Sequence, residues 1–145
     1  MKTITQLLEA KAKGRDIFSI APGALVFDAL KLMAEKEVGA LVVMEGGRLV
    51  GIISERDYAR KVILHGKSSH DIPVREIMTG KVITVHPGQT VAECMALMTG
   101  KRVRHLPVVT EGDRLVGLLS IGDLVKEVIA DQERTIRQLE SYIHR

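Results

Sequence analysis

The chain has 145 residues, a formal net charge of +3 and a hydrophobic content of 46%, which is ordinary for a globular protein with one apolar core. Two Tyr, two Phe and no Trp leave little material for stacking nucleobases, so we expect no nucleic-acid partner. No apolar run approaches the roughly 20 residues that span a bilayer, and the N-terminus lacks a signal-peptide apolar region. With the lone Cys94 unable to form an internal disulfide, these features predict a cytoplasmic protein with no membrane partner.

The first segment, residues 1–16, carries the start signal of a helix. Thr3 is a capping residue, Gln6 follows three positions later, and apolar Leu7 comes next. Gly14 is the expected end of this helix. We interpret the segment as an N-terminal helix and lead-in.

Residues 17–63 form the first of two similar units. Their apolar periodicity alternates between that of strands and that of helices, and Gly46-Gly47 supplies the positive-φ positions of a tight hairpin. The pattern predicts the order β-α-β-β-α, with elements at Ile17–Ile20, Val26–Lys36, Ala40–Met44, Leu49–Ser54 and from about Glu55. On the two main helices we expect the following residues in the core: Val26, Phe27, Leu30, Met33, Ala34, Cys94, Met95 and Met98.

Residues 79–130 repeat this unit. Pro22-Gly23 aligns with Pro87-Gly88, and one inserted residue then aligns Arg48–Gly51 with Arg114–Gly117. The second set of elements is expected at Val82–Val85, Val91–Met98, His105–Thr110, Arg114–Ser120 and from about Ile121. Because each unit is small, we expect the two to share one core with pseudo-twofold symmetry and to form two equivalent clefts.

The remaining segments connect and extend the repeats. Residues 64–78 form a linker with a polar stretch, His65–Asp71, and one helical turn at Pro73–Met78. Residues 131–145 form a helical tail, since neither Pro nor Gly interrupts the chain after Asp123. The tail continues a last helix that is expected to begin near Ile121. The apolar positions of this helix follow three- and four-residue steps and either pair with a second subunit or fold back on their own body; they are Val125, Ile129, Ile136, Leu139 and Ile143, with Gln132 filling the gap.

Both repeats end on the pattern Gly-apolar-apolar-Ser-x-x-Asp, at Gly51–Asp57 and Gly117–Asp123. Taken alone, Ser followed three residues later by an acid is typical of a helix capping box. A helix N-terminus at the end of a strand also suits a phosphate, and a carboxylate one turn later can accept both hydroxyls of a ribose. The two interpretations are compatible, because a capping serine can serve both.

The duplicated order of motifs resembles a tandem CBS-domain module, named after cystathionine β-synthase. The resemblance rests on Ala21–Val26, Leu106–Val109 and the two Gly-x-x-Ser-x-x-Asp endings, and it covers Asp16 to about Ala130. It implies an α+β fold in which two β-α-β-β-α repeats pack as one pseudo-twofold module. The chain is also similar to small stand-alone bacterial two-CBS proteins that carry no catalytic domain.

The resemblance further implies a regulatory module, not an enzyme, that binds AMP, ATP or NAD(H) in the clefts between the repeats and acts in signal transduction without a catalytic cofactor or metal. Ser and Asp of each motif would contact phosphate and ribose, and two flanking segments would hold the adenine. The residues implied for the first cleft are Arg15, Asp16, Ile17, Val38, Gly39, Ala40, Ser54, Arg56 and Asp57. Those implied for the second are Gly80, Lys81, Val82, Val103, Arg104, His105, Ser120, Ile121, Gly122 and Asp123.

The two clefts differ in their cations. Arg56 has Gly122 as its counterpart, whereas Arg104-His105 corresponds to Gly39-Ala40. We hypothesise that the Ser54/Asp57 site demands the more anionic ligand, with Arg56 assisted by Arg104 or His105. The alternative is that these arginines are solvated surface cations.

Other classes of function find less support. The five histidines, His65, His70, His86, His105 and His144, follow no metal-ligand spacing, and His65 and His70 are expected to be solvated. The competing hypothesis is a ligand-free dimeric scaffold that binds partner proteins through its helices. In either case we expect a homodimer and a regulated partner protein.

Overall fold

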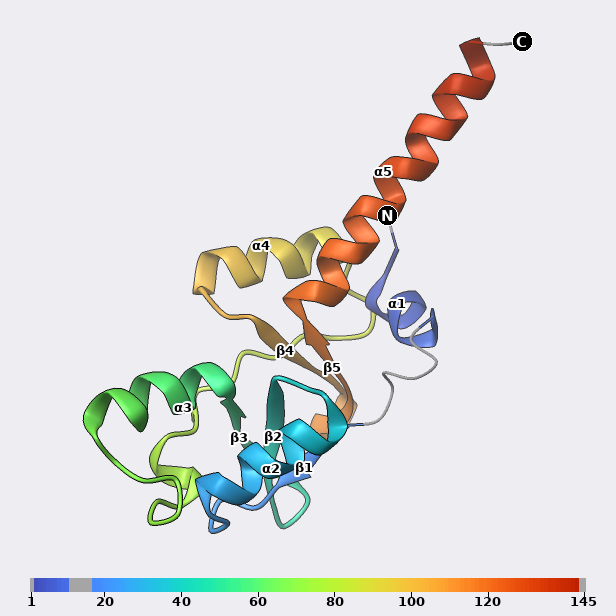
Figure 1. Ribbon diagram of the computed structural model, residues 1–145. Coiled ribbons are helices and arrows are strands. Elements are labelled where there is room, and N and C mark those ends of the chain that lie inside the picture. Colours follow the sequence, from blue (N-terminus) through green and yellow to red (C-terminus); the bar gives the residue numbers. More distant parts are fainter. Residues whose placement is uncertain (1, 11–16, 144–145) are drawn as a thin grey trace. The chain divides into compact units, whose positions relative to one another are not determined.

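The computed structural model describes residues 2–10 and 17–143, and these fall into two compact units. Residues 17–83 form one, called here the first-repeat unit, and residues 2–10 with 84–143 form the other, the second-repeat unit. Both combine a small sheet with helices (Figure 1). The predicted α+β class is confirmed, and the N-terminal helix belongs to the second-repeat unit.

The first-repeat unit is built on a three-stranded sheet in the order β1-β2-β3. Strands β1 and β2 are parallel, and β2 and β3 form an antiparallel hairpin whose register shifts between Val43 and Met44. Gly46 and Gly47 have φ values of 58° and 78°, so the expected hairpin is confirmed. The elements are β1 (Ser19–Ile20), α2 (Val26–Lys36), β2 (Ala40–Glu45), β3 (Arg48–Ser54), α3 (Glu55–Lys61) and the short 3₁₀ turns η1 (Ile63–His65) and η2 (Val74–Glu76).

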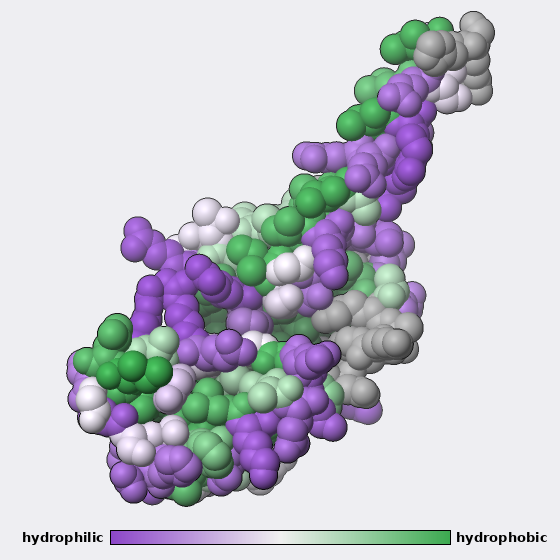
Figure 2. All heavy atoms as spheres, in the orientation of Figure 1, coloured by the Kyte–Doolittle hydropathy of each residue, from purple (hydrophilic) through white to green (hydrophobic). Residues whose placement is uncertain are grey.

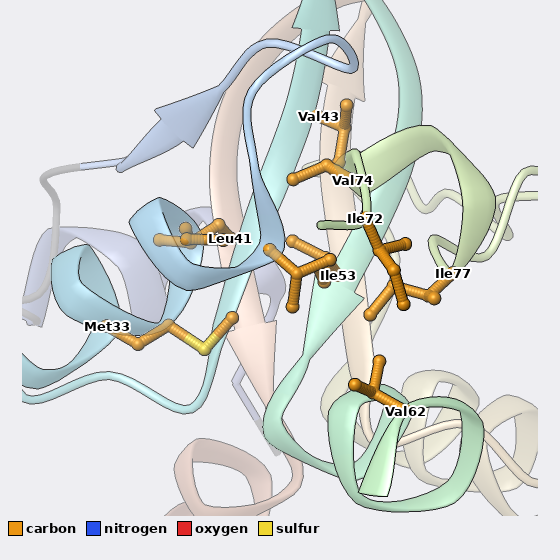
Figure 3. Close-up of a cluster of buried hydrophobic side chains, with 10 residues drawn as sticks. Met33, Leu41, Val43, Ile53, Val62, Ile72, Val74 and Ile77 are labelled. Carbon is orange, nitrogen blue, oxygen red and sulfur yellow. The ribbon is translucent and has the colours of Figure 1, made fainter. Parts of the chain in front are cut away.

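The core of this unit is closed by the segment that follows η1. Figure 3 shows Ile72, Val74 and Ile77 from that segment packed beside strand residues such as Val43 and Ile53. The predicted helical turn at Pro73–Met78 is present as η2, and the fully buried Val74 makes it part of the core.

Two predicted core residues of α2 lie outside the core. The buried face of α2 carries Val26, Ala29 and Met33, whereas Phe27 and Ala34 are exposed. Val26 N–H donates to Ile72 O over 2.9 Å, which fixes the start of the helix and turns Phe27 outward. Phe27 stacks instead on His70, with ring centroids 4.1 Å apart.

The second-repeat unit contains a two-stranded antiparallel sheet, with a register shift between Val108 and Val109 that matches the one in the first unit. Buried Cys94 and Met98 confirm the predicted core face of its first long helix, and Met95 is half-buried. The elements are α1 (Ile4–Ala10), α4 (Val91–Lys101), β4 (His105–Thr110), the 3₁₀ turn η3 (Glu111–Asp113), β5 (Arg114–Ser120) and α5 (Ile121–Ile143).

The strand predicted at Val82–Val85 is wrong, because only Val85 forms a parallel bridge, to Val108. In the first unit Val42 N–H donates to Phe18 O over 3.2 Å. Pro107 occupies the position of Val42 and has no amide hydrogen. The equivalent ladder bond therefore cannot form, and the strand shortens to one bridge.

Helix α1 closes the second-repeat unit in the same way as residues 72–79 close the first-repeat unit. Ile4 N–H donates to Gln89 O over 2.9 Å, as Val74 N–H donates to Ala24 O over 2.7 Å. The predicted cap is confirmed, since Thr3 N–H donates to Gln6 Oε1 over 3.0 Å. The predicted end of the helix at Gly14 lies outside the described residues.

Helix α5 runs to Ile143, as predicted within the described chain. In Figure 1 its C-terminal half extends away from α4, β4 and β5 of its own unit. None of the helices in residues 2–10 and 17–143 has both the length and the apolar character needed to cross a membrane.

Candidate functional site

The Ser54/Asp57 motif forms a complete capping box at the start of α3. Asp57 N–H donates to Ser54 Oγ over 3.2 Å, and Ser54 N–H donates back to Asp57 Oδ2 over 2.9 Å. The Ser54 hydroxyl adds a third bond to the same carboxylate oxygen, over 3.0 Å. The structural interpretation of the motif is therefore correct, and the two side chains are held in fixed positions at the end of β3.

The entrance to β2 lies beside this motif. Ala40 is the partner of Ser54 in the β2–β3 register, and Glu55 N–H donates to Gly39 O over 3.1 Å. The parallel register of β1 and β2, in which Ser19 is the partner of Val42, brings half-buried Ile17 to the same end of the sheet. The fold thus brings Ile17, Val38–Ala40 and Ser54–Asp57 to one end of the sheet. These segments contain the described residues that were predicted for the first cleft.

The second-repeat unit reproduces this arrangement. Asp123 N–H donates to Ser120 Oγ over 3.2 Å, and Ser120 N–H donates to Asp123 Oδ2 over 2.8 Å. His105 is the partner of Ser120 in the β4–β5 register, and Ile121 N–H donates to Arg104 O over 2.9 Å. Val103–His105 and Ser120–Asp123 are therefore neighbours, as predicted.

Some predicted site residues lie elsewhere. Arg15 and Asp16 are outside the described residues. Gly80 and Lys81 are exposed and Val82 is half-buried, at the end of the first-repeat unit. Arg56 and Arg104 are exposed side chains that flank the two motifs.

Sequence reasoning missed the charged side chain one turn after each motif. Lys61 Nζ lies 3.2 Å from Asp57 Oδ1 and also donates to Ile77 O over 2.8 Å. Aligning the repeats on their aspartates places Glu127 at the position of Lys61. This charge reversal was visible in the alignment of the repeats, but only the structure shows what each residue contacts.

The Glu127 side chain is only 5% exposed, and its carboxylate forms ion pairs with two basic side chains. Its Oε1 lies 2.8 Å from Arg134 Nη2 and its Oε2 lies 3.5 Å from Lys2 Nζ. Arg134 also contacts Asp131 Oδ1 at 3.3 Å. The hydrogen bond to Glu127, followed by that to Asp131, raises the pKa of Arg134 despite the opposing effect of burial. The two motifs thus share a backbone but differ in their charged surroundings.

Other potentially reactive groups do not gather into a site. Cys94 is buried, and burial, followed by the nearby Glu93, raises the pKa of its thiol. Across the described part of the chain, no three His, Cys, Asp or Glu residues are grouped as metal ligands.

Comparison with known proteins identifies the family. The CBS-domain model matches residues 13–64 and 74–130. The mitochondrial CBS domain-containing protein CBSX3 of Arabidopsis thaliana is 40% identical over 97% of this chain and 71% of its own length. The chain therefore belongs to the CBS-domain family and carries two CBS domains.

Solved structures agree with this assignment. A protein with CBS domains from Burkholderia ambifaria, described as a candidate signal-transduction protein, is 56% identical with a TM-score of 0.84; the match covers 90% of this chain and 96% of that chain. The CBS domain pair of protein MJ0100 was solved with 5′-methylthioadenosine and S-adenosylmethionine. It has a TM-score of 0.79 over 90% of this chain and 98% of that chain, and at 23% identity it shows a shared fold.

Proposed function

We propose that this CBS pair is a regulatory sensor, not an enzyme, that binds an adenosine-containing ligand through its two Ser-x-x-Asp motifs. The observation that carries the proposal is the repeated arrangement in which a capping box lies beside the entrance of the neighbouring strand. Ala40 and Ser54 are register partners in one unit, as His105 and Ser120 are in the other. The relationship to a candidate signal-transduction protein supports a regulatory role.

The geometry suits the recognition of a ribose. Asp57 and Asp123 each use Oδ2 to accept the N–H of the capping serine. A carboxylate oxygen can accept more than one hydrogen bond, so a ribose hydroxyl can donate to the same group without removing the cap. Such charge-assisted bonds contribute about 1.5–3 kcal/mol each.

The adenine requires an apolar surface near the ribose. In the first-repeat unit half-buried Ile17 and Val38 border the strand entrance beside Ser54. Backbone groups of Gly39 and Ala40 lie at the same edge and provide the polar partners that a base needs. The contacts of Arg15, Asp16, Gly80, Lys81 and Val82 with the ligand remain predictions.

The charge reversal between Lys61 and Glu127 bears on the choice of ligand. Lys61 adds a positive charge 3.2 Å from Asp57, which reduces the repulsion between that carboxylate and a nearby phosphate. Together with Arg56 it supports the hypothesis that the Ser54/Asp57 motif takes the more anionic ligand. At the other motif, Arg104 and His105 are the basic side chains placed beside Ser120.

A sensor also needs two states that a ligand distinguishes. Binding would favour one conformation and present it to a regulated partner protein. The size of this effect is limited by the difference in the ligand's affinity for the two states.

Thermal unfolding with a nucleotide panel tests the proposal. AMP, ADP, ATP, NAD, NADH and S-adenosylmethionine are compared with GTP as the base control. A ligand at about 100 times its Kd adds roughly 2.7 kcal/mol, which raises the Tm by about 5–10 °C for a protein of this size. A flat panel, or equal shifts with guanine and adenine nucleotides, contradicts the proposal and favours the ligand-free scaffold.

Variants then assign the sites. Asp57→Asn and Asp123→Asn keep an oxygen for the cap and remove the charge, and each is expected to reduce the ligand-induced shift relative to its own unliganded Tm. Asp28→Asn is the matched control, because Asp28 is an exposed first-turn acid of α2 outside both motifs. A full ligand shift in both motif variants overturns the assignment.

The charge hypothesis has a separate test. Lys61→Gln should lower the preference for ATP over AMP by roughly 2–5-fold, the range of an exposed charge pair. Lys31→Gln on the exposed side of α2 is the control. An unchanged ratio of the two Kd values in Lys61→Gln rules out a role for Lys61 in selecting the phosphate.

A further inference from the structure

Lys61, the last residue of α3, joins the first motif (Ser54–Asp57) to the segment that ends the first-repeat unit. Its Nζ lies 3.2 Å from Asp57 Oδ1 and donates to Ile77 O over 2.8 Å. Ile77 belongs to residues 77–83, called here the exit segment, after which the chain enters the second-repeat unit. One side chain thus contacts both a carboxylate of the proposed ligand site and the connection between the repeats.

The exit segment is held to β3 just before the first motif. Thr79 N–H donates to Ile52 O over 2.8 Å, and Ile52 N–H donates to Thr79 O over 3.1 Å. After this bridge, residues 80–84 belong to no helix or strand. Since Thr79 is exposed, its amide can be released by local opening without unfolding of the unit. The bond from Lys61 to Ile77 O, two residues earlier, therefore helps to decide how firmly the segment is held.

Helix α3 depends on its two ends for its position. None of the seven residues Glu55–Lys61 is buried, and Figure 2 shows hydrophobic and hydrophilic side chains together on the surface of this region. Tyr58 packs against the core but stays half-buried. The capping box fixes the first turn, and the contacts of Lys61 fix the last. A change at the first motif therefore reaches Lys61 through a single short helix.

The ammonium group of Lys61 can also serve a ligand. A lysine has three N–H donors, and the contacts that the described residues give it, with Asp57 and Ile77, use two of them. A ribose hydroxyl that donates to Asp57 Oδ1 can accept the third N–H. The Lys61 side chain is 45% exposed, so a ligand can reach it and restrict its motion. Because this loss of side-chain freedom then serves both contacts, ligand binding and the bond to Ile77 O favour each other.

The second-repeat unit shows no equivalent connection among its described residues. Its second motif (Ser120–Asp123) is followed by Glu127 in place of Lys61, and Glu127 pairs with Arg134 and Lys2. The element that closes this unit, α1, precedes both repeats in the chain and does not join them. A ligand at the second motif therefore lacks this route to the connection.

We propose that Lys61 is a positioning residue through which a ligand at the first motif tightens the exit segment, whereas a ligand at the second motif does not. The proposal rests on the proposed function, since an adenosine-containing ligand must bind at the first motif. Because coupling between two sites is reciprocal, a firmly held exit segment also raises the affinity of the first motif for its ligand. The two repeats then have different roles, and the first one carries the signal to the connection.

Hydrogen exchange of the ¹⁵N-labelled protein, followed by amide NMR with and without saturating ATP, tests the proposal. In the wild type ATP should slow exchange of the Thr79 amide by at least about 5-fold, the lower end of the range for coupled sites. Lys61→Met keeps the apolar part of the side chain and removes its donors, and ATP should then leave the Thr79 rate unchanged. Arg60→Met removes a charge from the same turn of α3. It is the matched control and should behave as the wild type.

Variants of the two motifs separate their roles. Asp123→Asn should keep the effect of ATP on Thr79, and Asp57→Asn should remove it. An unchanged Thr79 rate while ATP shifts the amide signals of Ser54–Asp57 overturns the proposal, and so does equal slowing in the wild type and Lys61→Met. Signals of Ser54–Asp57 that ATP does not move overturn the assignment of the first motif as a ligand site, and this proposal with it.

Discussion

The two repeat units share a backbone frame and differ in the charges placed on it. Val26 N–H donates to Ile72 O in one, and Val91 N–H donates to Lys2 O in the other, over 2.9 and 3.1 Å. The segments that supply these acceptors, IPVREIMT and KTITQLLE, have little sequence in common. The shared backbone arrangement thus requires an apolar segment whose backbone carbonyl groups can accept hydrogen bonds. The charges at the motifs can differ without disturbing this arrangement.

The clearest divergence follows the two capping boxes, where Lys61 corresponds to Glu127. Lys61 contacts the motif carboxylate and Ile77 O, so it connects the motif to the closing segment of its unit. Glu127 instead connects α5 to Lys2 beside the start of α1. Each unit therefore joins its closing segment to its last helix by a charge, but with opposite sign.

The largest expected effect comes from the two glycines that face the closing segments. A Cβ at Gly51 would lie 2.7 Å from Met78 Sδ and 3.0 Å from Thr79 O, whereas a Cβ at Gly117 would lie 2.8 Å from Leu8 Cδ2. Gly51→Ala should lower the free energy of unfolding by about 1–3 kcal/mol. Gly117→Ala should cost less, because the end of Leu8 can rotate away while the Thr79 carbonyl cannot. Urea denaturation measures both, and a larger loss in Gly117→Ala contradicts the comparison.

The buried charge of the second-repeat unit comes next. Glu127→Gln keeps the shape of the side chain and removes the charge that faces Arg134 and Lys2. We expect a loss of about 1.5 kcal/mol in urea denaturation, at the lower end of the range for hydrogen bonds to charged groups, because Arg134 and Lys2 are partly exposed. Glu133→Gln on the exposed part of α5 is the control. Equal midpoints for the two variants would show that the Glu127 cluster adds nothing to stability.

The capping boxes should respond equally. Ser54→Ala and Ser120→Ala each remove an acceptor that lies 3.2 Å from the aspartate N–H, and each should cost about 1 kcal/mol. Both losses are measured as shifts of the urea midpoint. A difference well above the experimental error would show that the two frames are less alike than their hydrogen bonds indicate.

The smallest effect distinguishes the two helix cores. Fully buried Cys94 of α4 corresponds to fully buried Ala29 of α2. Because the pKa of the thiol is raised, by burial and then by Glu93, the thiol stays protonated in the folded chain after it ionises in the unfolded one. Its contribution is complete below the ordinary value of 9.0 and is lost as the pH rises above it.

Cys94→Ala gives the second unit the residue that the first unit uses. The free energy of unfolding of the wild type should fall more steeply between about pH 8 and pH 10 than that of the variant. Identical slopes would show that the thiol pKa is the same in both states.

The local features of this fold could be predicted from the sequence. The hairpin glycines, the Thr3 and Ser54 caps and the extent of α5 depend on residues close together in the chain. The outward position of Phe27 could not be predicted, since it depends on the bond from Val26 to the distant Ile72. The sequence places Pro107 at the position of Val42, but the effect of this proline on the strand predicted at Val82–Val85 depends on which backbone groups pair in the sheet.

The candidate site was predictable to a similar degree. The repeated motif located Ser54, Asp57, Ser120 and Asp123, and hairpin pairing explains why the strand entrances lie beside them. Lys61 and Glu127 escaped prediction, because a charged residue on a helix is usually exposed to solvent. Lys61 contacts Ile77, which lies 16 residues further along the chain. Glu127 contacts Arg134, which lies seven residues later on the same helix.

We propose that both capping boxes are parts of ligand sites. A titration of the ¹⁵N-labelled protein with AMP, followed by amide NMR, tests it most directly. We expect shifts of the amide signals of Ser54–Asp57 and Ser120–Asp123, with adjacent changes at Gly39 and Arg104. Saturating AMP, ATP and S-adenosylmethionine that leave both groups of signals unmoved would contradict it.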